Sequence, residues 1–562
     1  MYKNITIVIG ITILFLGTCI TPSVANNSIE QSFTPTFKGK TLYVGGSGEG
    51  NYSKIQDAIN DTMDGDTVYV FNGLYNESVN IDKSIDVIGE DKYSTIIDGQ
   101  KKRARVVKLR VDGITFSGFS VIHSRDWAND AGIYIYSSYN VIKNNIIKDN
   151  KGGEGGIAVD GDYNLIYNNI VRKNGEFGIF IGYQDHYNVI SGNIIENHYR
   201  GMWLAADHGN VVANNYISNN SNDGIMIRGV EDYDVHDNII ENNNGAAIRI
   251  EWDASNVLVY SNIIKNNGEG LVINDATYIT VAGNSFYVSG IRLKGNKLDH
   301  WISHKINNNT INGRSINYFK SKTDLVVPSN TSQLILGDCS NCSVKDLHIS
   351  NVYYGIQLGF SNGNNIVSNE FNDNVGPCIF ITSSSNNVID SNLIINTIGT
   401  GIVIGGNSQN NEITKNNILN NTDGIKIGEK SSLNIICDNN IENNENRGVY
   451  LVGSENKIYR NNFKQNYWGV ILDFSYNNSI FENNFIRNNF LGSFRVDYTR
   501  IHDNNWDKNY YSFYFRIFPK IIWGRVKTKY YWIPGDNYKM YIYRHGINFD
   551  WNPAEEPYDI EV

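Results

Sequence analysis

The chain has 562 residues, of which 19% are charged, and its formal net charge at pH 7 is −10. This acidic balance disfavours contact with nucleic acid, so we expect no nucleic-acid partner. The length exceeds that of a usual single domain, which leaves several domains or a repetitive fold as ways to bury a core.

Residues 1–25 have the composition of a signal peptide. Lys3 provides a positive charge, residues 5–16 an apolar core, and Ser23-Val-Ala25 a cleavage site of small residues. We expect cleavage after Ala25, with an uncleaved membrane anchor as the alternative. No second apolar stretch of about 20 residues follows, so we expect no further transmembrane segment and a chain that lies outside the cytoplasm.

Residues 26–101 are expected to form an N-terminal cap and the first coils of a repetitive fold. Thr41-Leu-Tyr-Val44 is typical of a strand. Ser53-Lys-Ile-Gln56 has the form of a capping box and opens an apolar helical stripe. We predict a short helix that covers the open end of the fold, where backbone groups would otherwise be unpaired.

A short sequence motif recurs at a fixed interval in residues 102–294. Gly178-Ile-Phe-Ile181, Gly201-Met-Trp-Leu204 and Gly224-Ile-Met-Ile227 follow one another at intervals of 23 residues. Such a period indicates a solenoid, and the short Ile- and Val-rich runs favour strands over helices. Because strand side chains alternate, the first and third apolar residues point inward and the middle residue points outward. The sequence therefore predicts an all-β parallel β-helix of about 20 coils.

Asparagines recur once per coil and are expected to stack as a hydrogen-bonded ladder. In the first block the column is Asn145, Asn169, Asn193, Asn215, Asn238 and Asn262. In residues 295–345 the spacing of the repeats is irregular. In residues 346–500 the regular spacing returns, and we treat these residues as a second block. There the expected column is Asn369, Asn392, Asn417, Asn440, Asn462, Asn484 and Asn505. The aromatic residues 501–562 are expected to form a C-terminal cap.

The segment Tyr43 to Gly99 and the repeated glycine motif resemble right-handed parallel β-helix proteins of the NosD type and the carbohydrate-binding and sugar-hydrolase (CASH) group. Asn309-Thr-Ile-Asn-Gly-Arg-Ser-Ile-Asn-Tyr-Phe319 resembles the interruption in NosD-like surface proteins, and Asn504-Asn-Trp-Asp507 the end of archaeal surface members. The resemblance covers about residues 40–555. It implies a pectate-lyase-like fold with an N-terminal capping helix. NosD itself is tied to copper-site maturation of nitrous oxide reductase.

The Met, Cys and His residues of the chain match a copper site poorly. Soft copper sites need clustered Met, Cys and His, but the methionines after residue 25 are only Met63, Met202, Met226 and Met540, and the histidines are scattered. Cys339-Ser-Asn-Cys342 lacks a second pair of ligands for zinc. We expect these cysteines to fill the core, with a disulfide between them as the alternative. No metal site or cofactor is predicted from the residues, and copper is kept as the cofactor that the resemblance implies.

The outward positions of the first block combine aromatic, acidic and basic residues. Phe180 and Trp203 occupy the middle of the motif in consecutive coils, and Arg249 occupies the same position further on. Arg228 and Glu251 lie two residues beyond the middle position of their own coils. Aromatic rings cover apolar sugar faces, and charged groups bind hydroxyls or uronate carboxylates. We predict that these five residues form a groove for a polysaccharide or surface glycan.

Two Asp-His pairs lie in the turns after these strands and are the catalytic candidates. Asp185 and His186 recur as Asp207 and His208, 22 residues later. A histidine with a carboxylate can act as a base and its orienting group. Tyr183-Gln-Asp-His186 resembles the Asp-Pro-His motif of β-helix uronan C5-epimerases, but the proline is absent. The alternative is that all four residues belong to ordinary solvated turns.

The sequence thus predicts a secreted or surface-attached, monomeric β-helix protein that binds polysaccharide or cell-envelope glycan, or that serves as a structural protein. The first alternative is a carbohydrate-active enzyme: a polysaccharide lyase, a uronan C5-epimerase or a hydrolase. The second alternative is a copper-binding maturation factor like NosD.

Overall fold

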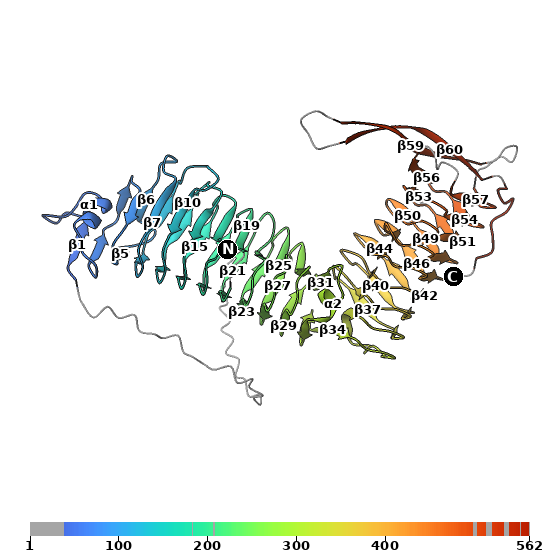
Figure 1. Ribbon diagram of the computed structural model, residues 1–562, viewed down its shortest axis with the longest axis horizontal. Helices are drawn as coiled ribbons and strands as arrows, with labels where there is room; N and C mark the ends of the chain where they lie inside the picture. Colours follow the sequence, from blue (N-terminus) through green and yellow to red (C-terminus); the bar gives the residue numbers. More distant parts are fainter. Residues whose placement is uncertain are drawn as a thin grey trace, which may run out of the picture. The chain divides into compact units, whose positions relative to one another are not determined.

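A computed structural model of the protein describes residues 39–182, 184–205, 208–497, 503–512, 520–532, 539–550 and 552–560. The predicted signal segment, residues 1–25, lies outside these ranges. The described chain is a parallel β-solenoid in which strands of one coil pair with strands of the next (Figure 1). Its helices α1 (Ile55–Asn60) and α2 (Asp299–Ile302) are short, and no helix of the described ranges is long and apolar enough to cross a membrane.

Each coil of the first block contains three short strands that belong to three sheets. In one coil these strands are β10 (Ala131–Ile135), β11 (Val141–Lys143) and β12 (Ile146–Lys148). Their equivalents in other coils form sheet C, sheet A and sheet B, respectively. Sheet A has 12 strands, from β1 (Thr41–Val44) to β32 (Lys305–Asn307). In the first block, sheet B runs from β3 (Gly73–Tyr75) to β33 (Thr310–Ile311). The predicted all-β solenoid is confirmed.

Sheet C has 10 strands and carries the repeated glycine motif. Its inward residues stack directly on one another, with Ile157 paired to Ile179 and Ile179 to Met202. All three side chains are fully buried. The strands of sheet C are β4 (Val79–Ile81), β7 (Arg105–Leu109), β10, β13 (Gly155–Val159), β16 (Phe177–Ile181), β19 (Arg200–Ala205), β22 (Ile225–Arg228), β25 (Ala246–Glu251), β28 (Glu269–Asn274) and β31 (Ile291–Lys294).

The predicted asparagine ladder of the first block is confirmed. The backbone N–H and the side-chain Nδ2 of each asparagine donate to the Oδ1 of the asparagine one coil later, at 2.9–3.1 Å. The members are Asn145, Asn169, Asn193, Asn215, Asn238 and Asn262, as expected. The ladder satisfies polar groups that would otherwise be buried without partners.

In the second block the ladder is shifted by one residue from the predicted column. Asn369 and Asn392 lie in it as expected, but the next members are Asn416, Asn439, Asn461 and Asn483, not Asn417, Asn440, Asn462 and Asn484. The strand β46 (Asn417–Leu419) starts directly after Asn416, so Asn417 is already a strand residue with its side chain outward. The last predicted member is displaced further: Asn505 starts β57 (Asn505–Asp507), and the ladder member is Asn509, four positions after it.

The N-terminal helix α1 is present but is capped differently from the prediction. It contacts β1, β2 (Thr67–Val70) and β4 at the start of the solenoid. Ser53 makes no capping hydrogen bond. The carboxylate of Glu77 accepts hydrogen bonds from the N–H groups of Ile55 and Gln56 instead, both at 3.0 Å. A residue 22 positions away thus satisfies the helix N-terminus that the local motif leaves open.

Sheet C ends at β31, where two glutamine side chains replace the next strand. There sheet B continues into the second block through β34 (Arg314–Lys320), β35 (Thr331–Gly337) and β38 (Ile356–Gly359). Gln333 accepts from the N–H of Ile291 and donates to its carbonyl, both at 2.8 Å. Gln357 accepts from the N–H of Leu293 at 3.1 Å and donates to the Ile291 carbonyl at 2.7 Å. These amides satisfy a sheet edge that would otherwise be buried without partners.

The last coils end in an antiparallel hairpin of β59 (Lys520–Trp532) and β60 (Lys539–Asp550). The buried carboxylate of Asp550 accepts two hydrogen bonds from Asn509, one from its backbone N–H and one from its side-chain amide. It accepts a third from the hydroxyl of Tyr511, and all three are 3.0 Å long. Asp550 therefore terminates the asparagine ladder of the second block.

Candidate functional site

The outward face of sheet C carries the side chains predicted to bind a ligand. The strand register pairs Phe180 of β16 with Trp203 of β19, and Trp203 with Met226 of β22. Arg228 and Glu251 are paired in the adjacent outward row. Strands of successive coils lie about 4.8 Å apart, so these side chains meet within one region of the surface.

Four of the five predicted binding residues line one pocket, which has a volume of about 560 Å³. The pocket spans four coils and combines aromatic, acidic and basic side chains. Its lining residues are Glu176, Phe177, Phe180, Arg200, Trp203, Met226, Arg228 and Glu251. We refer to it as the sheet C pocket.

Three aromatic side chains form the apolar part of the sheet C pocket. The ring centroid of Phe177 lies 5.5 Å from that of Phe180 and 5.4 Å from that of Trp203. Phe177 is 7% exposed, whereas Phe180 and Trp203 are half-buried. The buried ring supports the two outer ones, which keep accessible aromatic surface of the kind that covers apolar sugar faces.

Two arginines approach the same tryptophan. The guanidinium groups of Arg200 and Arg228 lie 5.2 Å and 5.5 Å from the ring centroid of Trp203. The nearest carboxylate oxygens are 3.6 Å from each Nε, on Asp223 for Arg200 and on Glu251 for Arg228. These separations attract the charges but are too long for hydrogen bonds.

Arg249 also projects from the outward face of sheet C but is held by an ion pair and does not line the pocket. Its Nη2 and Nε donate to the two oxygens of Asp223 at 3.0 Å and 3.1 Å. Asp223 is 2% exposed and also accepts from the N–H of Ala246 at 2.7 Å. A buried, bidentate pair of this kind leaves Arg249 little capacity for a ligand.

Asp185 lies beside this face, and its carboxyl group has an unusual proton affinity. It accepts a hydrogen bond from the N–H of Gly182 at 3.1 Å. Burial raises the pKa of Asp185 to about 7, and the charge of Asp160 acts in the same direction. Hydrogen bonds from the N–H groups of Gly161 and Gly182 oppose this pKa shift. A Cβ at Gly182 would lie 3.4 Å from the carboxylate and 3.5 Å from the Phe180 ring, so the two groups share one edge of the face.

His186 is oriented by a carboxylate other than the predicted one. Its Nδ1 lies 3.2 Å from Oδ1 of Asp162, one coil earlier, and its backbone N–H donates to the same oxygen at 2.6 Å. Asp185 is turned toward Gly182 instead, so the predicted pairing of neighbours is replaced by a pairing between coils. The imidazole rings of His186 and His208 lie 4.0 Å apart. Asp207 and Tyr183 fall outside the described residues.

Four lining residues were not among the predicted binding residues: Glu176, Phe177, Arg200 and Met226. Phe177 and Arg200 are paired in register and directly precede the repeated glycines Gly178 and Gly201. The alternation rule places only every second residue outward, and it is broken at this turn into the strand. An aromatic or charged residue immediately before the motif glycine is the signal that could have identified them.

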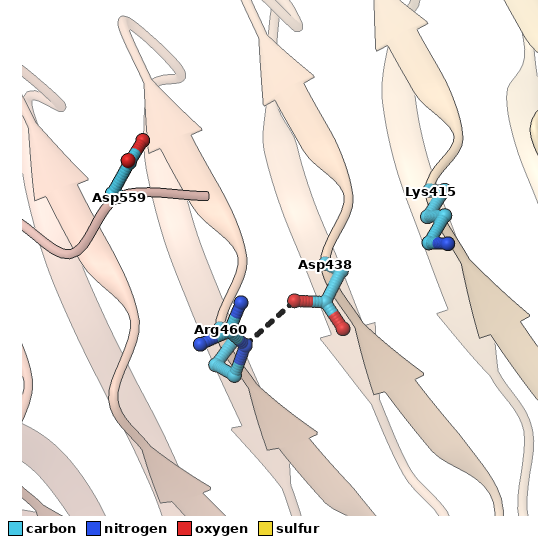
Figure 2. A pocket seen from close by; sticks show the side chains of 4 residues that line it. All are labelled: Lys415, Asp438, Arg460 and Asp559. Atoms are coloured by element: carbon cyan, nitrogen blue, oxygen red, sulfur yellow. Dashed lines mark hydrogen bonds and ion pairs between the residues drawn. The ribbon is translucent and has the colours of Figure 1, made fainter. Parts of the chain in front are cut away.

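A second, smaller pocket of about 290 Å³ lies in the second block and is lined by Lys415, Asp438, Arg460 and Asp559. Figure 2 shows the first three side chains on successive coils and Asp559 on the terminal segment. Arg460 Nε donates to Asp438 at 2.7 Å. The first three residues have left-handed backbone, with φ of 51°, 55° and 53°, so they belong to one column of turns. Because Arg460 is paired with Asp438 and no aromatic side chain lines this pocket, it is a weaker ligand site than the sheet C pocket.

Two family models match the chain. The right-handed β-helix region matches residues 92–229, 131–286 and 198–332, which overlap. The family described as periplasmic copper-binding protein (NosD) matches residues 317–468. No curated protein sequence matches.

Solved structures share the solenoid at low identity. The Dettilon tailspike protein has a TM-score of 0.39 and 14% identity, over 61% of this chain and 70% of that one. An alginate lyase from Paenibacillus sp. str. FPU-7 has a TM-score of 0.36 and 12% identity, over 49% of this chain and 96% of that one. The pectate lyase Pel9A has a TM-score of 0.32 and 16% identity, over 54% of this chain and 78% of that one.

The residues present do not fit the copper that the second family description implies. Within the described ranges, no three His, Cys, Asp or Glu side chains are placed to hold a metal ion. Cys339, Cys342, Cys378 and Cys437 are free and buried. Burial raises the pKa of Cys339 to about 11 and that of Cys378 to about 12, which disfavours the thiolate form that binds metals. The cysteines instead fill the core. The chain has the fold of a right-handed parallel β-helix, and its residues 317–468 match the NosD family model.

Proposed function

We propose that the protein binds polysaccharide or cell-envelope glycan through the sheet C pocket, as an exported, monomeric protein. The observation that carries the proposal is the half-buried pair of Phe180 and Trp203, supported from beneath by Phe177 and flanked by charged groups. Exposed aromatic surface of this size is unfavourable in water unless a partner covers it. Rigid rings beside hydrogen-bonding groups suit sugars, which have apolar faces and polar edges.

The repetition of the fold supports an extended ligand. Adjacent coils repeat the strand spacing of about 4.8 Å, so roughly one sugar residue spans each coil. The outward row continues beyond the pocket to Tyr134 on one side and Arg249 on the other. A chain of sugars would therefore find a further aromatic contact at Tyr134, whereas Arg249 is already held by Asp223.

The test is a glycan array followed by calorimetry with the purified protein and its Trp203→Ala variant. We expect Trp203→Ala to weaken binding at least about tenfold, which is the effect of losing a stacked aromatic anchor, while its melting temperature changes little. The matched control is Tyr287→Ala, which removes a 45% exposed aromatic side chain from sheet B. Unchanged affinity of Trp203→Ala for a glycan that the native protein binds would refute the proposal.

A carbohydrate-active enzyme is the second candidate, and Asp185 is the observation that favours it. A carboxyl group with a pKa of about 7 can donate or accept a proton at neutral pH, as a general acid or base must. Asp185 lies beside Phe180, whose ring lines the sheet C pocket, and this neighbourhood supports the candidate. Release of products from a bound polysaccharide that is abolished in Asp185→Asn, with binding retained, would establish this activity.

A further inference from the structure

Five arginines project from the outward face of sheet C, namely Arg105, Arg200, Arg228, Arg249 and Arg292, and two of them form hydrogen bonds with carboxylates. Arg249 donates two hydrogen bonds to the carboxylate of Asp223, and Arg292 donates one to Glu269 at 2.9 Å. Arg200 and Arg228 make no such bond, because their nearest carboxylate oxygens are 3.6 Å away. Arg200 and Arg228 line the sheet C pocket, whereas the paired Arg249 and Arg292 lie outside it, as does Arg105, whose Nε is also buried without a hydrogen-bond partner.

The Nε atoms of Arg200 and Arg228 are buried and have no hydrogen-bond partner. Removing a charged donor from water without supplying an acceptor is unfavourable, so native structures satisfy such groups almost always. An acceptor that arrives with a ligand would satisfy both. Oxygens of a carboxylate suit the planar fork of a guanidinium, because both groups are planar and form parallel pairs of hydrogen bonds.

Arg200 and Arg228 both approach the ring of Trp203, which is part of the aromatic surface that a sugar ring would cover. Both guanidinium groups are within 5.5 Å of the tryptophan ring centroid. Arg228 also lies 3.0 Å from the ring centroid of Trp252. A sugar stacked on Trp203 therefore has its substituents beside one or both arginines.

The carboxylates of the pocket do not cancel this arrangement. Asp223 is engaged by the fork from Arg249, so only Glu176 and Glu251 remain to balance Arg200 and Arg228. Glu176 is 49% exposed and its oxygen is 4.0 Å from Arg200, so solvent screens the interaction. A ligand carboxylate can displace such loose contacts.

We infer that the sheet C pocket selects sugars that carry a carboxylate, and that Arg200 and Arg228 bind that carboxylate. This inference rests on the proposed glycan binding and narrows it to acidic glycans built from uronic acids. The two arginines are specificity-determining residues, and the aromatic rings supply the binding that acidic and neutral sugars share.

The experiment compares each acidic oligosaccharide with its own methyl ester, which keeps the sugar and removes the charge. The probes are oligogalacturonate, oligomannuronate and hyaluronan fragments, each measured by calorimetry in both forms. We expect at least one acid form to bind about tenfold more tightly than its ester, as befits a charge-assisted, bidentate contact. In Arg200→Gln and Arg228→Gln this preference should shrink toward equality, while affinity for the ester is retained.

Two further variants keep the result interpretable. Arg172→Gln removes the same charge from sheet B and should leave the preference unchanged, which separates contact from long-range attraction. Arg228→Lys keeps the charge without the fork and should show an intermediate preference. The melting temperature of each variant identifies any loss of folding.

The outcomes separate this inference from the proposed function. Equal affinities for acid and ester in the native protein, with both lost in Trp203→Ala, would overturn the selection of carboxylates but leave glycan binding standing. Binding restricted to sulfated glycans without carboxylates would overturn it as well. Absence of binding to every glycan would overturn both.

Discussion

Asn509 donates both its backbone N–H and its side-chain amide to one oxygen of Asp550, at 3.0 Å each. Every earlier member of this ladder donates to an asparagine in the next coil, and Asn483 donates in this way to Asn509. The last donors of the ladder thus meet a carboxylate, which accepts but cannot donate.

Replacing this carboxylate should loosen the C-terminal end of the solenoid. Asp550→Ala removes the acceptor of the two buried donors of Asn509, at a cost of about 1–3 kcal/mol per group. We expect faster proteolysis after residue 500 and a lower free energy of unfolding in urea. Asp550→Asn keeps an acceptor oxygen, so its free energy of unfolding should lie between those of the native protein and of Asp550→Ala. An Asp550→Ala variant as protected as the native protein would contradict the assigned role.

Ile179→Asp should destabilise the first block. Ile179 is fully buried between Ile157 and Met202, and an unpaired carboxylate there costs several kcal/mol. Because coils are stabilised by their neighbours, we expect the loss to extend over adjacent coils in hydrogen exchange. Ile194→Asp is the matched control, since Ile194 projects outward from sheet B and is 39% exposed. Equal melting temperatures for the two variants would show that the inward register is wrong.

Gln333→Leu tests the end of sheet C. Leucine can replace the volume of glutamine but leaves the N–H of Ile291 without its acceptor, while the Ile291 carbonyl keeps the hydrogen bond from Gln357. We expect the free energy of unfolding to fall by about 1–3 kcal/mol, as for other unsatisfied buried groups. The control is Gln409→Leu at an exposed turn. Hydrogen exchange of the Ile291 amide should accelerate only in the first variant.

The pKa of Asp185 predicts a pH-dependent contribution to stability. Its folded pKa of about 7 exceeds the unfolded value of about 4, so the folded state binds more protons between these two pH values. Stability from this group is therefore present below about pH 4 and is lost as the pH rises toward 7. Asp185→Asn does not titrate, so its stability relative to the native protein should increase over that range and then level off. A difference that stays constant with pH would contradict the assignment.

Copper retention is the fifth prediction. The described residues provide no clustered soft ligands, and the buried thiols favour their protonated form. After exposure to copper and dialysis, the protein should retain well under one equivalent by elemental analysis. Stoichiometric, tightly held copper would restore the maturation-factor alternative.

The repeated part of the fold could be predicted because its physics is local. A 23-residue period and the alternation of strand side chains are enough to place Ile179 inward and Phe180 outward. The same rules failed where two asparagines are adjacent, as at Asn416 and Asn417, because either satisfies the period and only the start of the strand decides which one is buried.

Contacts between distant residues could not be predicted from the sequence. Gln333 and Ile291 are 42 positions apart and lie in different sheets, and no local pattern relates them. Within the site, periodicity identified Phe180, Trp203, Arg228 and Glu251 as neighbours. It could not show that Asp223 occupies Arg249 and leaves Arg200 unsatisfied, because that choice depends on side-chain distances.

The asparagine ladders also limit how the length of this protein can change. In each coil the ladder asparagine donates to the Oδ1 of the asparagine in the next coil. Removing the segment between one ladder asparagine and its equivalent in the next coil therefore leaves matching donors and acceptors on both sides of the deletion. A deletion of any other size would put strand residues where the ladder needs an amide. Genes for such a chain can therefore gain or lose whole coils by unequal recombination, and the number of coils on either side of the sheet C pocket is free to vary while the pocket itself is kept.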